Sequence, residues 1–296
     1  MDVVLNINNL SKSYGRIKAL DQLNLSIEKG NIYGILGPNG SGKTTTLGII
    51  LSILKADSGS FEWFGGRYGE NPRKYIGAIL ETPNFYPYKS GLDNLKIIAA
   101  IKNIRKFDFD NVMKIVNLEH RKTSKFKTYS LGMKQRLAIA ATMIGDPEIV
   151  IFDEPTNGLD PSGIAEVREI LMRIAESGRT VIMASHILDE VEKICSHVAI
   201  IKKGKLLADG VVGELLSTDY VLEINALDKN KLVAFINSNI SMKLVNSNEK
   251  FISCTVKSDI SPDQISTNAF NNGLILNHFV ARKQSLEKEF LTITNE

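Results

Sequence analysis

One stretch, residues 37–44 with the sequence GPNGSGKT, restricts the fold of this chain more than any other. It matches the pattern G-x-x-x-x-G-K-[ST], in which glycines let backbone N–H groups turn inward around a phosphate. Residues 32–36 before it are mostly apolar and predict a short buried strand, and residues 45–54 after it predict a helix. This order of strand, glycine loop and helix suits phosphate binding, because the helix N-terminus adds partial positive charge.

The side chains of this loop predict a nucleotide site. Lys43 is expected to reach the β- and γ-phosphates, and the Thr44 hydroxyl is expected to bind magnesium. A glycine turn with a chance lysine is the alternative, which the flanking strand and helix disfavour. The remaining residues expected to contact the nucleotide here are Gly37, Asn39, Gly40, Ser41, Gly42 and Thr45.

Composition sets limits on the class of protein. The chain has 296 residues, 43% of them hydrophobic and 23% charged, which is ordinary for a globular protein of one large or two average domains. Its net charge of +3 is too small to indicate nucleic acid as a partner. Two distant cysteines predict reduced thiols of a cytosolic protein. Neither a signal peptide nor an apolar run of ~18–20 residues is recognisable, so any membrane part is expected on another chain.

A pair of carboxylates follows a second predicted strand, residues 148–152. Asp153 is expected to help hold magnesium, and Glu154 to polarise a water for in-line attack on the γ-phosphate. An ordinary polar turn is the alternative, which the phosphate loop about 110 residues earlier disfavours. Strands alternating with helices predict a mostly parallel sheet with active residues at the strand ends. Glu81 and His186 also follow predicted strands, so they are expected at the same edge.

Six segments, taken in order, resemble the motifs of the ATP-binding cassette (ABC) transporter ATPases over about the first 215 residues. Residues 37–44 are similar to the Walker A motif, and residues 149–154 to Walker B with Glu154 at the catalytic base. Residues 129–136 are similar to the signature, and residues 157–160, which end in Asp160, are similar to the D-loop. His186 is similar to the switch histidine, and Tyr14 to the aromatic residue that stacks on adenine.

The resemblance assigns roles that single residues leave open. Tyr14 alone is equally well a half-buried tyrosine at a strand end, and His186 alone is a capping or core histidine. The signature departs from the family pattern, with Leu131 replacing its first glycine and Met133 its glutamine. Ser130 and Gly132 remain, so a hydroxyl and a helix N-terminus are still expected to meet a γ-phosphate.

Glu81 is the second departure, because the family usually has glutamine there. An ionised glutamate offers only oxygens, which magnesium prefers as ligands, and it lacks the N–H donor of glutamine. We therefore expect Glu81 to face magnesium and the γ-phosphate. The alternative is a loop glutamate that points to solvent. The loop that follows carries Phe85 and Tyr86 between two prolines, and these aromatics are expected to form a contact surface.

The resemblance implies an α/β fold, the P-loop NTPase cassette, with a mixed sheet and a helical subdomain at about residues 88–146. This cassette is expected to span residues 1–217. From residue 218 to 296 asparagine and serine become frequent and no chemical motif is recognisable. The predicted order β-α-β-β-α-β indicates a small ferredoxin-like α+β domain there.

The implied function is that of the ATPase subunit of a transporter. Two copies would face each other head to tail, with ATP and magnesium between the phosphate loop of one copy and the Ser130 helix of the other. They would drive separate membrane permease subunits from the cytoplasmic face of the membrane. The signature, Glu81 and the C-terminal region resemble the bacitracin-resistance and lantibiotic self-immunity branch, which implies export of antimicrobial peptides.

Three alternatives remain open from the sequence. The first is an exporter ATPase for another substrate. The second is a soluble cassette ATPase acting on DNA or ribosomes, but such proteins usually carry two cassettes or a long coiled-coil insert, and this chain has neither. The third is a nucleotide-sensing regulator without turnover, which the intact Lys43, Asp153, Glu154 and His186 argue against.

Overall fold

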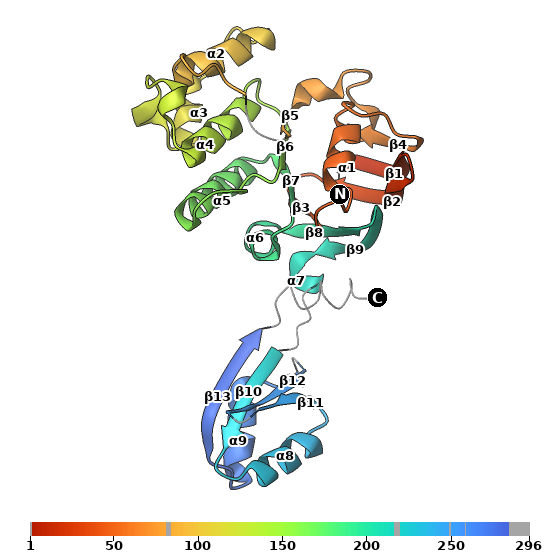
Figure 1. Cartoon of the computed structure of the whole chain (residues 1–296), viewed down its shortest axis with the longest axis vertical. Coiled ribbons are helices and arrows are strands. Elements are labelled where there is room, and N and C mark those ends of the chain that lie inside the picture. Colours follow the sequence, from red (N-terminus) through yellow and green to blue (C-terminus); the bar gives the residue numbers. More distant parts are fainter. Residues whose placement is uncertain (1, 81–83, 216–219, 249, 258, 284–296) are drawn as a thin grey trace. The chain divides into compact units, whose positions relative to one another are not determined.

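The computed structural model describes residues 2–80, 84–215, 220–248, 250–257 and 259–283. The chain forms two compact units, residues 1–212 and 213–296 (Figure 1). Each unit has its own sheets and its own hydrophobic core. The boundary predicted between residues 217 and 218, the helix predicted over residues 285–291 and Glu81 all lie outside the described residues.

A six-stranded sheet forms the centre of the first unit, in the order β5-β6-β7-β3-β8-β9. The first five strands are parallel, and β9 runs antiparallel to β8. Leu36 pairs with Ser185, and Asp153 pairs with Ala184, so the carboxyl ends of β3, β7 and β6 are level. The strands of this sheet are β3 (Ile32–Leu36), β5 (Ile76–Ile79), β6 (Ile149–Asp153), β7 (Thr180–Ser185), β8 (His197–Lys202) and β9 (Lys205–Val211).

A second, antiparallel sheet has the order β2-β1-β4, with β1 at Val3–Tyr14, β2 at Ile17–Glu28 and β4 at Ser58–Trp63. The loose alternation of apolar residues over residues 3–9 predicts a strand that is followed by a turn over residues 11–15, and this prediction is wrong because β1 extends to Tyr14. The strand continues because the pairing with β2 resumes after register shifts, so that Tyr14 pairs with Ile17. The chain reverses at Gly15 and Arg16 instead.

Three helices between β5 and β6 pack against one another: α2 (Gly91–Ile101), α3 (Phe109–Ile115) and α4 (Leu131–Thr142) (Figure 1). Ser90 caps α2 and Asp108 caps α3, because each side chain accepts the backbone N–H three residues further on. The other helices of the unit are α1 (Lys43–Ile50), α5 (Pro161–Glu176) and α6 (Leu188–Ile194), and the short 3₁₀ turns are Phe64–Gly66, Pro72–Tyr75, Glu119–Arg121 and Phe126–Thr128. A short helix, α7 (Val212–Leu215), spans the boundary between the two units.

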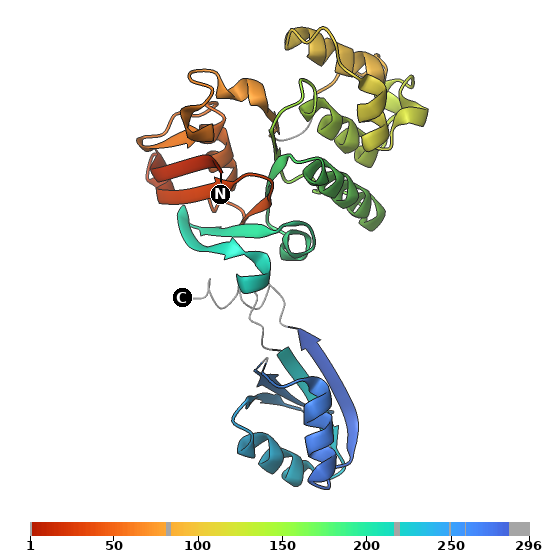
Figure 2. The same cartoon turned by 180° about the vertical axis from the view of Figure 1, so that it is seen from behind.

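The second unit is a four-stranded antiparallel sheet in the order β11-β12-β10-β13, with α8 and α9 on one face (Figure 2). Along β10, residues alternate between buried and half-buried, so every second side chain joins the core under the helices. This β-α-β-β-α-β order is the predicted ferredoxin-like arrangement. Its elements are β10 (Tyr220–Ala226), α8 (Lys229–Ser238), β11 (Met242–Ser247), β12 (Ile252–Val256), α9 (Pro262–Asn271) and β13 (Leu276–Lys283).

Candidate functional site

The glycine loop connects β3 to α1 and is held tightly at both ends. A Cβ on Gly37 would lie 2.2 Å from the backbone oxygen of Ile201, and one on Gly42 would lie 2.6 Å from that of Ala19. Gly42 also has a φ of 114°, which L side chains rarely adopt. Only glycine fits these two positions without displacing the backbone that packs against them.

Lys43 curls back over this loop. Its Nζ donates hydrogen bonds to the carbonyl oxygens of Gly37 at 2.8 Å and Pro38 at 3.3 Å, and the side chain is buried. Ser41 is also buried, and its Oγ has no hydrogen-bond partner among the described residues. An ammonium and an unpaired hydroxyl inside a ring of backbone groups fit the phosphates of a nucleotide.

The predicted magnesium ligands and the predicted base meet at the carboxyl ends of β3, β6 and β7. The Thr44 hydroxyl donates to Asp153 Oδ2 at 2.7 Å. One carboxylate oxygen of Glu154, Oε1, lies 3.5 Å from Lys43 Nζ, and the other, Oε2, lies 2.8 Å from His186 Nδ1. Hydroxyl and carboxylate oxygens side by side fit a hard cation such as Mg²⁺. The structure therefore brings Lys43, Thr44, Asp153, Glu154 and His186 together in one cluster.

The backbone of Glu154 is unusual. Its φ is 51°, in the left-handed region that few residues other than glycine adopt. Its N–H donates to Ala184 O at 3.0 Å, and its carbonyl accepts from Asn157 N–H at 3.1 Å. These bonds turn the chain sharply after β6 and aim the Glu154 side chain at Lys43 and His186.

Ser130, Gly132 and Asp160 form a second group. They line a pocket of about 430 Å³, and the ten described residues around it include none of the phosphate loop. The Ser130 hydroxyl accepts the Met133 N–H at 3.2 Å and so caps α4, while Asp160 caps α5 by accepting the Gly163 N–H at 2.9 Å. Two helix N-termini thus open on this pocket, and its charged lining residues are Arg136, Asp160 and Glu166.

The remaining predicted contacts are exposed or half-buried. Tyr14 ends β1 and is 47% exposed, and Lys12 Nζ lies 5.6 Å from its ring centroid. Asn39 and Gly40 are exposed, and Thr45 is half-buried on α1. An exposed tyrosine ring offers a face on which an adenine could stack.

The aromatic loop after Glu81 differs in part from the prediction. Phe85 is half-buried, because its ring packs on the buried Phe126 with centroids 5.0 Å apart. Tyr86 is 61% exposed, and its backbone is held by the buried Asn94. Tyr88, which the sequence did not single out, is 74% exposed, and Lys127 Nζ lies 5.3 Å from its ring centroid. The exposed aromatics of this loop are therefore Tyr86 and Tyr88, whereas Phe85 is partly covered.

Sequence reasoning also missed a buried pair behind Glu154. The Thr156 hydroxyl donates to the carboxylate of Glu190 on α6, and both side chains are buried. A signal was available, because Glu190 falls between Ile187 and Ile194 at the spacing of the buried helix face. Burial raises the pKa of Glu190 above its ordinary value.

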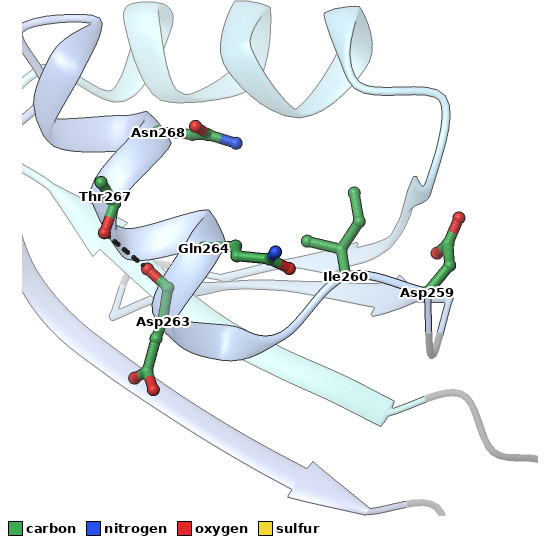
Figure 3. Close-up of a pocket in the computed structure, with 6 residues that line it drawn as sticks. All are labelled: Asp259, Ile260, Asp263, Gln264, Thr267 and Asn268. Carbon is green, nitrogen blue, oxygen red and sulfur yellow. Dashed lines mark hydrogen bonds between the residues drawn. The ribbon is translucent and has the colours of Figure 1, made fainter.

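The second unit carries a pocket of its own, of about 470 Å³, at the start of α9 (Figure 3). The six residues that line it are Asp259, Ile260, Asp263, Gln264, Thr267 and Asn268. The Thr267 hydroxyl donates to the backbone oxygen of Asp263 at 2.9 Å. These six described residues include no hydroxyl–base pair of the kind that activates a nucleophile. The recognised chemistry of the chain lies in the first unit.

Comparison with known proteins shows which family the chain belongs to. The family model described as ABC transporter matches residues 20–157. The bacitracin transport ATP-binding protein BcrA of Bacillus licheniformis is 41% identical over 242 residues, which cover 80% of this chain and 79% of that protein. The lantibiotic transport ATP-binding protein SrtF of Streptococcus pyogenes is 38% identical over 206 residues, covering 70% of this chain and 90% of that protein.

A solved structure agrees as well. A dimeric post-hydrolysis structure of the ATP-binding cassette MJ0796, bound to ADP and Pi, matches with a TM-score of 0.60 and 25% identity, covering 70% of this chain and 98% of that one. The predicted family, its cassette fold and its ATPase activity are therefore confirmed. This chain belongs to the ATP-binding cassette family and is an ATP-hydrolysing, nucleotide-binding subunit of an ABC transporter.

Proposed function

We propose that two copies of this chain, joined head to tail, power separate permease subunits that expel peptide antibiotics of the bacitracin or lantibiotic type. The observation that carries the proposal is the separation of the site into two groups. The cluster around Lys43 holds the base and the expected metal ligands, whereas Ser130, Gly132 and Asp160 line a different pocket. A second copy that presents its Ser130 pocket to the Lys43 cluster would complete each site.

Each residue of the cluster then has one task. Lys43 binds the β- and γ-phosphates, and Glu154 accepts a proton from the attacking water. His186 holds Glu154 Oε2 at 2.8 Å and so orients the carboxylate. Thr44 and Asp153 would hold Mg²⁺, which when bound neutralises charge on the phosphate oxygens. The opposing Ser130 hydroxyl and the N-terminus of its helix would contact the γ-phosphate from the other side.

Membrane association is proposed to come from the permease. Among the described residues, no helix is both long and apolar enough to cross a bilayer. Tyr86 and Tyr88 are exposed on a segment that backbone hydrogen bonds tie to residues 125–127. Exposed aromatic side chains are typical of a contact surface. The complex would lie on the cytoplasmic face of the membrane, with the cassette held there by its partner.

The names of BcrA and SrtF motivate the choice of substrate, and a susceptibility assay tests it. Deletion of the gene should lower the inhibitory concentration of bacitracin or of a lantibiotic, and the wild-type copy should restore it. The Glu154→Gln copy should fail to restore it. Unchanged susceptibility to both classes after deletion would contradict the substrate while leaving the ATPase assignment intact.

Docking is tested separately. Tyr86→Ala combined with Tyr88→Ala should weaken co-purification with the permease and leave ATP binding unchanged. Tyr75→Ala is the matched control, because it removes an exposed tyrosine at another place on the unit. If wild type, the Tyr86→Ala and Tyr88→Ala double variant and Tyr75→Ala all recover the same amount of permease, Tyr86 and Tyr88 do not form the docking surface.

A further inference from the structure

Glu190 is a carboxylate to which the proposed mechanism gives no role, yet it is only 3% exposed. One oxygen, Oε2, accepts the Thr156 hydroxyl, and Oε1 has no hydrogen-bond partner among the described residues. Burial raises the pKa of Glu190, and the charge of Glu154 raises it further, while Arg168 and His186 act in the opposite direction. Burying a carboxyl group with a single partner is unfavourable, so the contact with Thr156 needs a reason.

The position of Thr156 supplies one. It lies two residues after Glu154, in a turn that is closed by the hydrogen bond from Asn157 N–H to Glu154 O. A second hydrogen bond, from Leu159 N–H to Thr156 O, follows directly. The left-handed φ of 51° at Glu154 is strained and persists only where neighbouring contacts enforce it. On the strand side, the Ala184 carbonyl holds the Glu154 N–H. On the far side, the Thr156 hydroxyl is the side-chain anchor.

Glu190 also lies on the helix that directly follows His186 in the chain. Its helix, α6, begins at Leu188, two residues after that histidine. The Thr156–Glu190 bond therefore joins the turn that bears Glu154 to the segment that bears its hydrogen-bond partner. Movement of either segment would lengthen the 2.8 Å contact between Glu154 Oε2 and His186 Nδ1.

We propose that Glu190 is a positioning residue for ATP hydrolysis: through Thr156 it fixes the turn at Glu154 and keeps the carboxylate aimed at the attacking water. The proposal rests on the proposed role of Glu154 as the base. A purely structural anchor for α6 is the competing account. It predicts lower stability together with proportionate losses in ATP binding and turnover.

The test uses substitutions that change the hydrogen bond and little else, in the full chain. Thr156→Val removes the donor at nearly constant shape, whereas Thr156→Ser keeps the hydroxyl and Glu190→Gln keeps an acceptor oxygen. Thr180→Val is the matched control. It removes a buried hydroxyl that accepts the Gly30 N–H at 2.9 Å, at the opposite end of β7 from His186.

Thr156→Val should lower kcat about 10- to 100-fold, because displaced orienting groups have effects of this size, and the KM for ATP should stay within about 2-fold. Thr156→Ser, Glu190→Gln and Thr180→Val should keep kcat within about 3-fold of wild type. Should Thr156→Val fail to fold, Thr156→Ala is expected to show the same selective loss of kcat.

Two results would overturn the positioning role: a normal kcat in Thr156→Val, or parallel losses of kcat and ATP affinity. Glu154→Gln, assayed beside these variants, separates the two hypotheses. If Glu154→Gln turns over at a near-normal rate, Glu154 is not the base. If Glu154→Gln is slow but Thr156→Val has a normal kcat, Glu154 remains the base and only the positioning role of Glu190 is rejected.

Discussion

Replacing Glu154 by glutamine should do two opposite things, namely tighten ATP binding and nearly stop hydrolysis. The reason for the first lies in the 3.5 Å contact between Lys43 Nζ and Glu154 Oε1. The phosphates need the same ammonium group, so the ion pair competes with ATP. At an effective dielectric constant of about 20, two unit charges at this separation attract by roughly 5 kcal/mol before solvation is counted.

The net effect is smaller than this Coulomb energy. The Glu154 side chain is 21% exposed, so water screens the pair and holding two side chains in place costs entropy. We expect about 1 kcal/mol to remain, which corresponds to a Kd for ATP roughly 3- to 10-fold lower in Glu154→Gln. Turnover should fall about 10²- to 10⁴-fold, the range for losing a general base.

Calorimetric titration with Mg-ATP gives the Kd, and phosphate release gives the turnover. Glu148→Gln is the matched control, because Glu148 forms ion pairs with Arg67 and Lys29 just before the opposite end of the same strand. Its Kd and turnover should equal those of wild type. If Glu154→Gln hydrolyses ATP within about 3-fold of wild type, Glu154 is not the base. If Glu154→Gln binds ATP no more tightly than wild type, the hypothesis that Glu154 competes with ATP for Lys43 is wrong.

Four further predictions concern pairing of two copies, the C-terminal region, Glu81 and Glu190. ATPase rate per mole of chain should rise with protein concentration, since each site needs a second copy, and a flat dependence would contradict the head-to-tail pair. A chain ending at residue 217 should still bind Mg-ATP, and soluble protein that has lost binding would refute this. Glu81→Gln should stay active with an altered dependence on magnesium, and Glu81→Ala should bind ATP but lose transport; wild-type behaviour of Glu81→Ala would exclude the role. Burial raises the pKa of Glu190 above its ordinary 4.5, so the folded chain binds that proton more tightly than the unfolded chain. The Tm of wild type should therefore fall relative to that of Glu190→Gln as the pH rises above 4.5. A Tm difference between the two proteins that does not change with pH would count against this prediction.

The cluster around Lys43 was predictable because its parts obey local rules. The glycine loop is recognisable by the spacing of its glycines and lysine. Asp153, Glu154 and His186 each lie at or directly after the end of a buried strand. In an α/β fold such strand ends share one edge, so residues more than a hundred positions apart come together. The level pairing of β3, β7 and β6 realises this rule.

Contacts between irregular segments were not predictable in this way. Phe85 was expected to be exposed, but it packs on Phe126, which lies 41 residues away in a short 3₁₀ turn. No periodicity links these two segments, because neither is a long helix or strand. The extension of β1 to Tyr14 has a similar cause, since it depends on register shifts that local composition does not encode.

The geometry at Glu154 has a consequence for the order of events in the site. A general base needs a lone pair directed at the water, and the ion pair with Lys43 and the contact with His186 together decide where the remaining lone pairs of the two Glu154 oxygens point. Phosphate is a stronger partner for an ammonium than a partly solvated carboxylate, since it carries more charge. When the phosphates take Lys43, Oε1 becomes available while His186 still fixes the direction of the group. One lysine would then link substrate binding to activation of the base, so the carboxylate is released for catalysis only when there is a γ-phosphate to attack.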